Sequence, residues 1–381
     1  MQIALIGFHK SGKTAVFNAL TGANADVSAF SLGRAKTHRA TVTVPDDRLD
    51  RLHALLHPKK IVHASIDYLD PIGIRRDQVG HGSGLGDEML DAIGTADALA
   101  VVVRAFEDEG EGECDPEGDY EAIALELLLS DLAKVDNRLG RVAVQAQRVG
   151  GGDRAHLEAE MHLMQRLKEG LEAGRPVRDL NLTADESRTL RSFQFLTAKP
   201  LIVLVNTGEN ANSAQDLLAR LRERSAKAAG GDTGGSAASS ATAAFRSAAH
   251  FMALNGRTEM EIAQLAPEER ADFLAAYGID EPGAVRMTRL SYEALGVISF
   301  FTVAHNEGHA WTIHRGTPVV EAAGTVHSDM QRGFIRAQVI RWDALLEAGS
   351  VAEARKRGTL KIEGKDYIVQ DGDVIEIMFS A

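Results

Sequence analysis

The chain has 381 residues, 44% hydrophobic and 25% charged, which is typical of a soluble globular protein with two or three domains. A formal net charge of -12 argues against non-specific nucleic-acid binding, and a single cysteine, Cys114, excludes an intrachain disulfide and indicates a reducing compartment. No apolar run approaches the roughly 20 residues of a membrane-spanning helix and the N-terminus does not read as a signal peptide, so we expect a cytoplasmic protein without a membrane partner.

The first elements of the chain predict a nucleotide site. QIALI at 2–6 is a short apolar segment that indicates a buried strand, and it runs into GFHKSGKT at 7–14. The next residues have helical spacing and end at Gly22, a candidate C-cap. A strand, a glycine-rich loop and a helix in this order form the context that a phosphate-binding loop requires. Residues 1–60 are also rich in basic side chains, which suits a polyanion.

Each residue type in this loop has a chemical reason. The two glycines let backbone N–H groups approach the phosphates, the lysine reaches the β- and γ-phosphates, and the threonine hydroxyl ligates Mg²⁺. We therefore predict nucleotide binding, with Lys13 as a catalytic residue and Thr14 as a metal ligand. The predicted nucleotide-binding residues of the loop are Gly7, His9, Lys10, Ser11, Gly12, Lys13, Thr14 and Ala15. The alternative is a glycine turn that only resembles the motif.

A second motif follows a second predicted strand, at 63–70. Asp70-Pro71-Ile72-Gly73 offers a carboxylate for Mg²⁺ and a glycine N–H that can sense the γ-phosphate. Asp-x-x-Gly alone is a common turn, but after a phosphate loop we predict Asp70 as a metal ligand and Gly73 as part of the catalytic site. The glycine-rich stretch at 80–86 is a candidate switch loop.

The middle of the chain alternates strands with helices. Apolar segments at 96–103 and 199–206 predict further strands of a parallel sheet that is covered on both faces. Between them, 120–171 has helical spacing and is broken by the glycines of 149–153, which indicates an antiparallel helical hairpin. The Gly/Ala/Ser/Thr-rich tract at 225–245 predicts a flexible loop.

Asn206 and Glu209 follow the strand that would face the base. Guanine-specific switches place Asn-Lys-x-Asp here, whereas this chain has Asn-Thr-Gly-Glu at 206–209. An asparagine amide can pair with the N6/N7 edge of adenine, so a real site favours ATP over GTP. The alternative is an ordinary loop at the end of a strand.

The C-terminal part contains short strand-like pieces with turns between them. They include FIRAQVI, LKIEG, DYIV and VIEIMF, with hairpin signals at Gly364-Lys365 and at 371–373. This pattern predicts a separate small β-rich domain.

The chain resembles the YchF proteins, a branch of the Obg-related nucleotidases. The resemblance lies in GKTAVFNALTG, PDDRLDRL, GLGDEML, LSDLAKVDNRL, LTADESRTLRSFQFLTAKP, NTGE, GIDEPG and EGKDYIVQDGDVIEI, which occur in family order over nearly the whole chain. It implies an α/β fold with a Ras-like P-loop nucleotidase domain (1–118 and 197–298), a helical coiled-coil insertion (119–196) and a TGS-like β-grasp domain (299–381). It also implies an ATPase activity associated with the ribosome or the translation machinery, and relaxed or ATP-preferring specificity through Asn-x-x-Glu.

Several features depart from the family pattern. Where the family has Pro-Asn in the phosphate loop, this chain has His9-Lys10. The first switch has no clear match, and Thr37 is the candidate for its metal-sensing threonine. A histidine that the family carries after the fourth strand is missing, and 225–245 resembles an insertion. These differences predict slow, altered or lost hydrolysis.

The sequence does not decide which residue orients the water that attacks the γ-phosphate. Ile74 follows Gly73 and cannot hydrogen-bond the attacking water as the glutamine of Ras-type switches does. His81 and His9 are the candidate replacements. Lys10 stands where Obg-related nucleotidases use an asparagine that helps to bind a monovalent cation, so its ammonium group could replace that cation. The alternative is that the side chains of His81, His9 and Lys10 are solvated and have no catalytic role.

Two functional classes remain open from the sequence. The first is an ATP- or GTP-hydrolysing switch with a translation partner, which the intact loop and Asp70 favour. The second is a nucleotide-dependent binding module with little hydrolysis, which Ile74 and the missing histidine favour. A metabolic P-loop kinase fits poorly, because no lid or acceptor site is visible.

Overall fold

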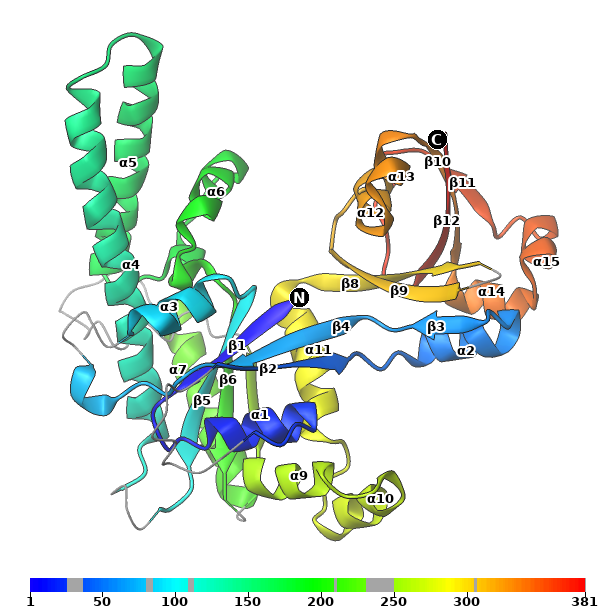
Figure 1. Cartoon of the computed structure of the whole chain (residues 1–381), viewed down its shortest axis with the longest axis horizontal. Helices are drawn as coiled ribbons and strands as arrows, with labels where there is room; N and C mark the ends of the chain where they lie inside the picture. The colour runs from blue at the N-terminus through cyan, green and yellow to red at the C-terminus, as the bar shows by residue number, and fades with distance from the viewer. Residues whose placement is uncertain are drawn as a thin grey trace. The chain divides into compact units, whose positions relative to one another are not determined.

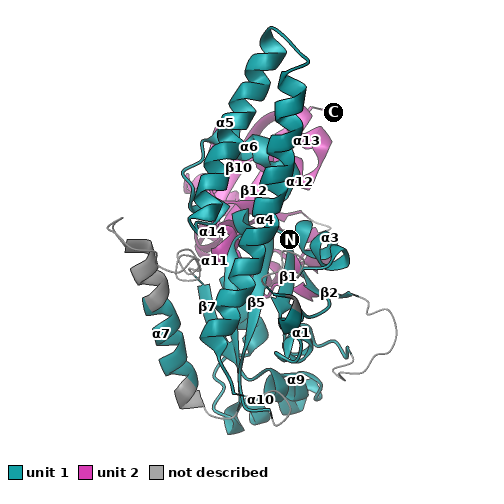
Figure 2. Ribbon diagram, turned by 90° about the vertical axis from the view of Figure 1, so that its left-hand side faces the viewer, with its two compact units in different colours: residues 1–40, 67–290 teal, residues 41–66, 291–381 magenta. Residues whose placement is uncertain are grey.

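The computed structural model describes residues 1–25, 37–79, 85–108, 113–208, 211–230, 250–304 and 307–380. The chain divides into two compact units (Figure 2). The first unit comprises 1–40 and 67–290, and the second comprises 41–66 and 291–381. Residues 41–66, which the sequence assigned to the nucleotidase domain, thus cluster with the C-terminal residues. Within the described residues, no helix is both long and apolar enough to cross a membrane.

A six-stranded sheet in the order β2-β4-β1-β5-β6-β7 forms the centre of the predicted nucleotidase fold (Figure 1). Its strands are β1 (Gln2–Gly7), β2 (His38–Thr43), β4 (Ser65–Asp70), β5 (Ala98–Ala105), β6 (Leu201–Thr207) and β7 (His250–Leu254). The pairs from β4 to β7 are parallel, as predicted. The carboxyl ends of these strands therefore meet at one edge, where ligands of parallel sheets bind.

Helices cover this sheet because the central strands are apolar on both faces. The helices outside the hairpin are α1 (Lys13–Thr21), α3 (Asp87–Gly94), α6 (Ala184–Leu190), α7 (Ala211–Gly230), α9 (Gly256–Ala263), α10 (Pro267–Ala276) and α11 (Gly283–Leu295). Side chains of α3 and α7 share one core with β1, β5 and β6. Figure 1 shows α1 and α9 side by side. As predicted, α1 ends at Gly22, whose φ is 65° and whose N–H bonds to Asn18 O.

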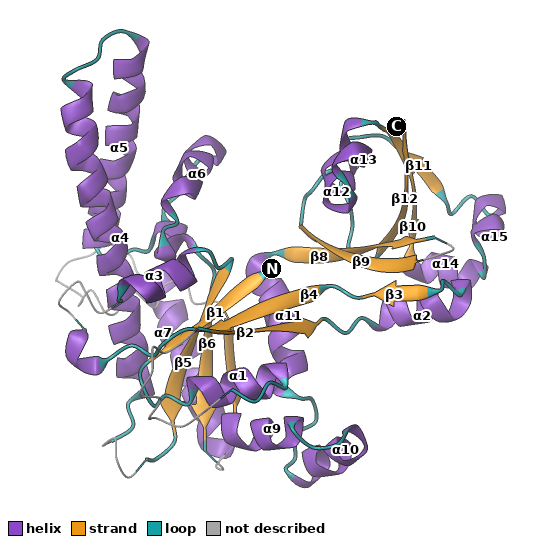
Figure 3. Ribbon diagram, in the orientation of Figure 1, coloured by secondary structure: helices purple, strands orange, loops and turns teal. Residues whose placement is uncertain are grey.

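The predicted helical hairpin consists of α4 (Pro116–Ala146) and α5 (Gly152–Glu172) (Figure 3). Asp115 caps α4 by accepting a hydrogen bond from Gly118 N, and Gly151, with φ 65°, lies in the turn between the two helices. Arg138 joins the arms by a forked ion pair with Glu160, at 2.7 and 2.8 Å. At the base, the fully buried Asp131 carboxylate accepts bonds from the backbone N–H groups of 196 and 197, which fixes the hairpin to the segment before β6.

The second unit contains a mixed sheet in the order β11-β10-β12-β8-β9-β3. Its strands are β3 (Lys60–Val62), β8 (Val297–Val303), β9 (Glu307–His314), β10 (Phe334–Arg341), β11 (Lys361–Glu363) and β12 (Asp373–Phe379). Its helices are α2 (Asp47–Leu56), α12 (Val319–Val326), α13 (Ser328–Arg332), α14 (Trp342–Ala348) and α15 (Val351–Lys356). The C-terminal β-rich domain of the sequence prediction is therefore present, with α2 and β3 added to it.

Three local predictions need correction or lie outside the described residues. DYIV at 366–369 is not a strand, because only Ile368 forms a bridge, to Pro318. The loop expected over 225–245 starts later, since α7 continues to Gly230; residues 231–249 lie outside the described part. Most of the candidate switch loop at 80–86 also lies outside it.

Candidate functional site

The phosphate loop leaves the buried end of β1 and leads into α1. Gly12 has φ 77°, and a Cβ atom there would overlap the amide nitrogen of Asn206. A Cβ atom at Gly7 would lie 2.7 Å from the carbonyl oxygen of Val102. Both predicted glycines are thus required by close backbone or side-chain approach. Lys10 is exposed and has φ 63°, a left-handed conformation that costs a residue with a side chain about 1 kcal/mol.

Lys13, Thr14 and Asp70 meet at the carboxyl edge of the sheet. The Lys13 ammonium group donates to the Asp70 carboxylate and to the carbonyl of Pro71. Thr14 Oγ1 donates to the other Asp70 oxygen at 2.9 Å. Burial lowers the pKa of Lys13, and the ion pair with Asp70 opposes that shift. The two separate motifs of the sequence therefore form one cluster.

Ser11 gives the loop an unused polar group. Its side chain is 2% exposed, and its hydroxyl has no hydrogen-bond partner within the described residues. A buried hydroxyl without a partner costs free energy, about 1–3 kcal/mol, unless a ligand satisfies it. In a loop of backbone N–H groups at a helix N-terminus, an anion is the ligand that fits.

The oxygen atoms of Thr14 and Asp70 suit a Mg²⁺ ion that takes only a few of its ligands from the protein. The Thr14 hydroxyl and the Asp70 carboxylate are the hard oxygen ligands that Mg²⁺ takes from protein. Across the described ranges, no group of three or more His, Cys, Asp or Glu side chains could hold a metal ion by itself. A Mg²⁺ ion here would therefore complete its shell with water and nucleotide oxygens, which is its usual coordination in nucleotide sites.

Gly73 lies against the phosphate loop. The N–H of His9 donates to Ile74 O at 2.8 Å, and the N–H of Ile74 donates to Gly7 O at 2.9 Å. A Cβ atom at Gly73 would lie 3.0 Å from His9 Cα, so the two predicted residues are direct neighbours. Ile74 itself is 1% exposed and belongs to the core. The segment after Asp70 is thus fixed to the loop by its backbone.

Asn206 binds backbone on both sides of its amide. Its Nδ2 donates to Ser11 O at 3.0 Å, and its Oδ1 accepts from the N–H of Gly256 at 2.9 Å. The side chain, 3% exposed, therefore connects the phosphate loop to the start of α9. Gly256 was not identified from the sequence; the Asn-Gly pair at the end of β7 was its only signal.

Phe106 lies between the phosphate loop and the loop after β6. A Cβ atom at Gly12 would lie 3.5 Å from the ring, and one at Gly208 would lie 3.4 Å from Phe106 Cβ. An aromatic ring in this place can pack against a purine. Phe106 was not predicted from the sequence, because a single aromatic residue after a strand carries no motif.

His38 contacts the Asp70 carboxylate. Its Nδ1 lies 3.3 Å from Asp70 Oδ2, and its ring lies 6.2 Å from that of Phe17. Thr37 is described, but it is exposed and directly precedes β2. The alternation of β2 is the signal that could have indicated an inward-facing first residue.

The remaining predicted residues are placed only in part. His81 and Glu209 lie outside the described residues, so their roles stay predictions. His9 is exposed in the loop, and Ala15 is half-buried at the start of α1.

Comparisons with known proteins identify relatives of this chain. A family model described as "YchF-GTPase_C: Protein of unknown function (DUF933)" matches residues 297–380. A Bacillus subtilis protein named ribosome-binding ATPase YchF is 34% identical over 387 residues, covering 100% of this chain and 99% of its own length. The protein of the same name from Escherichia coli O157:H7 is 33% identical, with the same coverage.

A solved structure, described as the Schizosaccharomyces pombe YchF GTPase, has the same fold. It matches with a TM-score of 0.76 and 23% identity, covering 99% of this chain and 97% of that one. The fold class predicted from the sequence is thereby confirmed. Full-length relatives above 30% identity, together with the C-terminal family match, establish that this chain belongs to the YchF family.

Proposed function

We propose that this chain binds a nucleoside triphosphate with Mg²⁺ at the carboxyl edge of the first sheet, hydrolyses it, and binds the ribosome in the cytoplasm. The main support for nucleotide binding is that Lys13 and Thr14, which directly follow the glycine loop, both contact Asp70. The name ribosome-binding ATPase, given to the Bacillus subtilis and Escherichia coli relatives, supports both parts.

Each residue of the cluster has a role in this proposal. Lys13 binds the β- and γ-phosphates, and the loop N–H groups with Ser11 hold the remaining oxygens. Thr14 and Asp70 hold Mg²⁺, which neutralises phosphate charge when bound. Asn206 orients the loop through Ser11 O. Steady-state phosphate release from ATP by the purified protein, with Lys13→Ala as the control, tests the hydrolytic part.

Ile74 favours a second candidate, a nucleotide-dependent binding module with little or no hydrolysis. Its side chain is apolar and 1% exposed, so it cannot hydrogen-bond an attacking water. ATP binding without phosphate release above the Lys13→Ala control would select this candidate.

ATP is expected to bind at least as well as GTP. The guanine-reading lysine and aspartate are replaced by Thr207 and Glu209, which removes the carboxylate geometry that guanine needs. Titration of both nucleotides, with and without Mg²⁺, measures the preference. A tenfold preference for GTP, about 1.4 kcal/mol, would contradict this prediction.

The protein is expected to co-sediment with ribosomes in the presence of a non-hydrolysable ATP analogue. The helical hairpin and the C-terminal domain have no catalytic motif of their own, so we assign partner binding to them. Recovery of the protein only in the free fraction, at low as well as high salt, would count against the proposal.

Replacing Lys10 by alanine is expected to lower kcat more than it weakens ATP binding. Near the bridging oxygen, its ammonium group would neutralise charge that develops as the β–γ bond breaks. Hydrolysis should then be the same in K⁺ and Na⁺. A Lys10→Asn variant, which tolerates the left-handed backbone and restores the family residue, should make hydrolysis depend on K⁺. Unchanged turnover in Lys10→Ala would show that Lys10 is only a solvated charge.

A further inference from the structure

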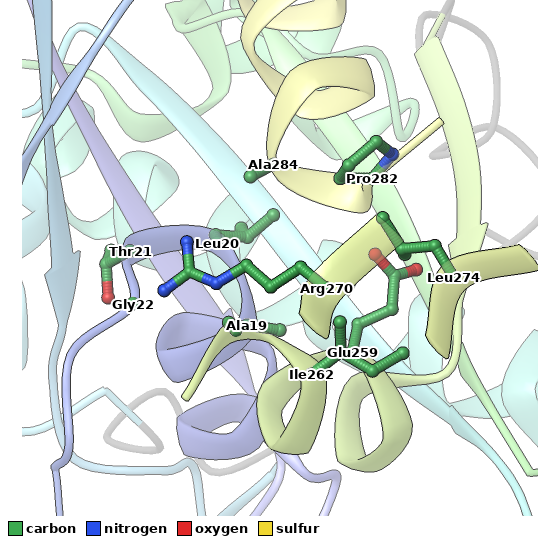
Figure 4. Close-up of a pocket in the computed structure, with 11 residues that line it drawn as sticks. Ala19, Leu20, Thr21, Gly22, Glu259, Ile262, Arg270, Leu274, Pro282 and Ala284 are labelled. Atoms are coloured by element: carbon green, nitrogen blue, oxygen red, sulfur yellow. The ribbon is translucent and has the colours of Figure 1, made fainter. Parts of the chain in front are cut away.

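A cavity of about 460 Å³ lies in the first unit, at the opposite end of α1 from Lys13. It is bounded by the last turn of α1, by α9, by α10 and by the start of α11 (Figure 4). Apolar side chains form most of its lining, among them Leu20, Ile262, Ala263, Leu274 and Pro282. Its volume is in the range of small-molecule sites, about 300–1,000 Å³.

Arg270, a solvent-exposed residue of α10, places a positive charge at the edge of this largely apolar lining. Figure 4 shows its side chain extending across the pocket, with the guanidinium group toward Thr21 and Gly22. Its Nε donates to the carbonyl of Leu265 at 3.0 Å. Neither terminal nitrogen has an acceptor or an ion-pair partner within the described residues. The planar fork that suits a carboxylate or a phosphate is therefore available.

The other charged group of the lining is already matched. Glu259 accepts bonds from the N–H of Gly283 and from Arg286 Nη2, the latter at 3.0 Å. It is 6% exposed and holds α9 against α11, so it is a structural carboxylate and leaves no net negative charge to repel a ligand. The acidic residues Glu268, Glu269 and Asp272 of α10 are exposed and do not line the cavity.

We propose that this cavity binds a small amphipathic monoanion, an aliphatic carboxylate whose tail lies among the apolar side chains and whose carboxylate is bound by Arg270. Burial of the tail supplies most of the affinity, at about 0.8 kcal/mol per methylene group, and the guanidinium fork fixes its orientation. An acidic head is favoured over a neutral one because, inside the described ranges, Arg270 is the only charged group of the lining without an ion-pair partner.

Isothermal titration of the full-length protein with octanoate tests the proposal. We expect saturable one-to-one binding, at least tenfold weaker in Arg270→Gln, and weaker for octanol than for octanoate. Arg257→Gln is the matched control, because Arg257 belongs to α9, is 86% exposed, pairs with Glu261 and does not line the cavity. This control should bind octanoate as the unchanged protein does.

Two further measurements keep the site distinct from the nucleotide site. Ala263→Phe should fill the cavity and abolish octanoate binding, while its thermal melting shows whether the fold is kept. Saturating ATP should leave octanoate binding unchanged, because the cavity lies at the opposite end of α1 from Lys13. Displacement by ATP, equal binding of octanol, or equal loss in Arg270→Gln and Arg257→Gln would each overturn the proposal.

Discussion

A Gly12→Ala variant is expected to bind ATP at least a hundredfold more weakly, a loss of about 2.7 kcal/mol. The residue has φ 77°, and the added Cβ atom would overlap the amide nitrogen of Asn206. Moving that amide disturbs its bonds to Ser11 O and to Gly256 N, which connect the loop to α9. Titration with ATP and thermal denaturation of the same variant measure binding and folding separately.

Variants of two other glycines distinguish the effect of the steric clash with Asn206 from the effect of backbone strain. Gly22 has φ 65°, but a Cβ atom there meets nothing within 4 Å. Gly22→Ala should therefore show only the strain, about 1 kcal/mol of stability, and keep ATP binding. Gly140 lies inside α4 in open space, so Gly140→Ala should stabilise the fold by up to about 1 kcal/mol. If Gly12→Ala binds ATP as well as Gly22→Ala does, contact with Asn206 has no importance for the site.

Local sequence predicted the phosphate loop because everything the loop needs lies within about twenty residues. The strand, the glycines and the helix of residues 2–22 follow one another, and the loop geometry depends on backbone angles that glycine alone adopts readily. Asp70 was within reach for a related reason. It ends β4, the second strand that the sequence predicted, and parallel pairing of β1 with β4 brings their carboxyl ends together.

Contacts between segments that are distant in the chain could not be predicted from local sequence. Asn206 connects to Ser11, 195 residues away, through its amide, a contact that the motif did not predict; the contact with the base stays a prediction. His38 reaches Asp70, because side chains of a strand alternate and the sequence did not fix which face turns inward. The metal-sensing role of Thr37 stays a prediction. In both cases tertiary packing decides which polar atom meets which.

The placement of α2 shows the same limit. No element was predicted here from the sequence, and an amphipathic pattern would not identify the partner of the buried face. Leu49 and Leu52 are fully buried in the second unit, and Arg48 bonds to Asp371 at 2.9 Å. Two stretches that carry the family resemblance, PDDRLDRL and QDGDVIEI, therefore contact each other across 323 residues. Their joint occurrence has a structural explanation, although neither belongs to the nucleotide site.

A Lys13→Ala variant is expected to lose at least a hundredfold in the rate of phosphate release. One donor aimed at developing charge supplies roughly that factor, and the lysine also holds the phosphates in the ground state, so KM should rise as well. The change removes a buried partner of Asp70, whose remaining contacts are Thr14 and His38. A lower rate can therefore also reflect a less stable fold, so the measurement needs a control variant at another partly buried lysine.

Lys199 is that control. It is half-buried in the same unit, its pKa is also lowered by burial, and its ammonium group donates to the carbonyls of Gly94 and Ala96 at 2.8 and 2.5 Å. Lys199→Ala should lower the melting temperature but leave phosphate release per folded molecule unchanged, because the residue lies before β6 and touches no part of the phosphate loop. Equal losses of turnover in the two variants, or none in Lys13→Ala, would contradict a catalytic role for Lys13. A loss confined to Lys13→Ala would place the reaction at the cluster of Lys13, Thr14 and Asp70.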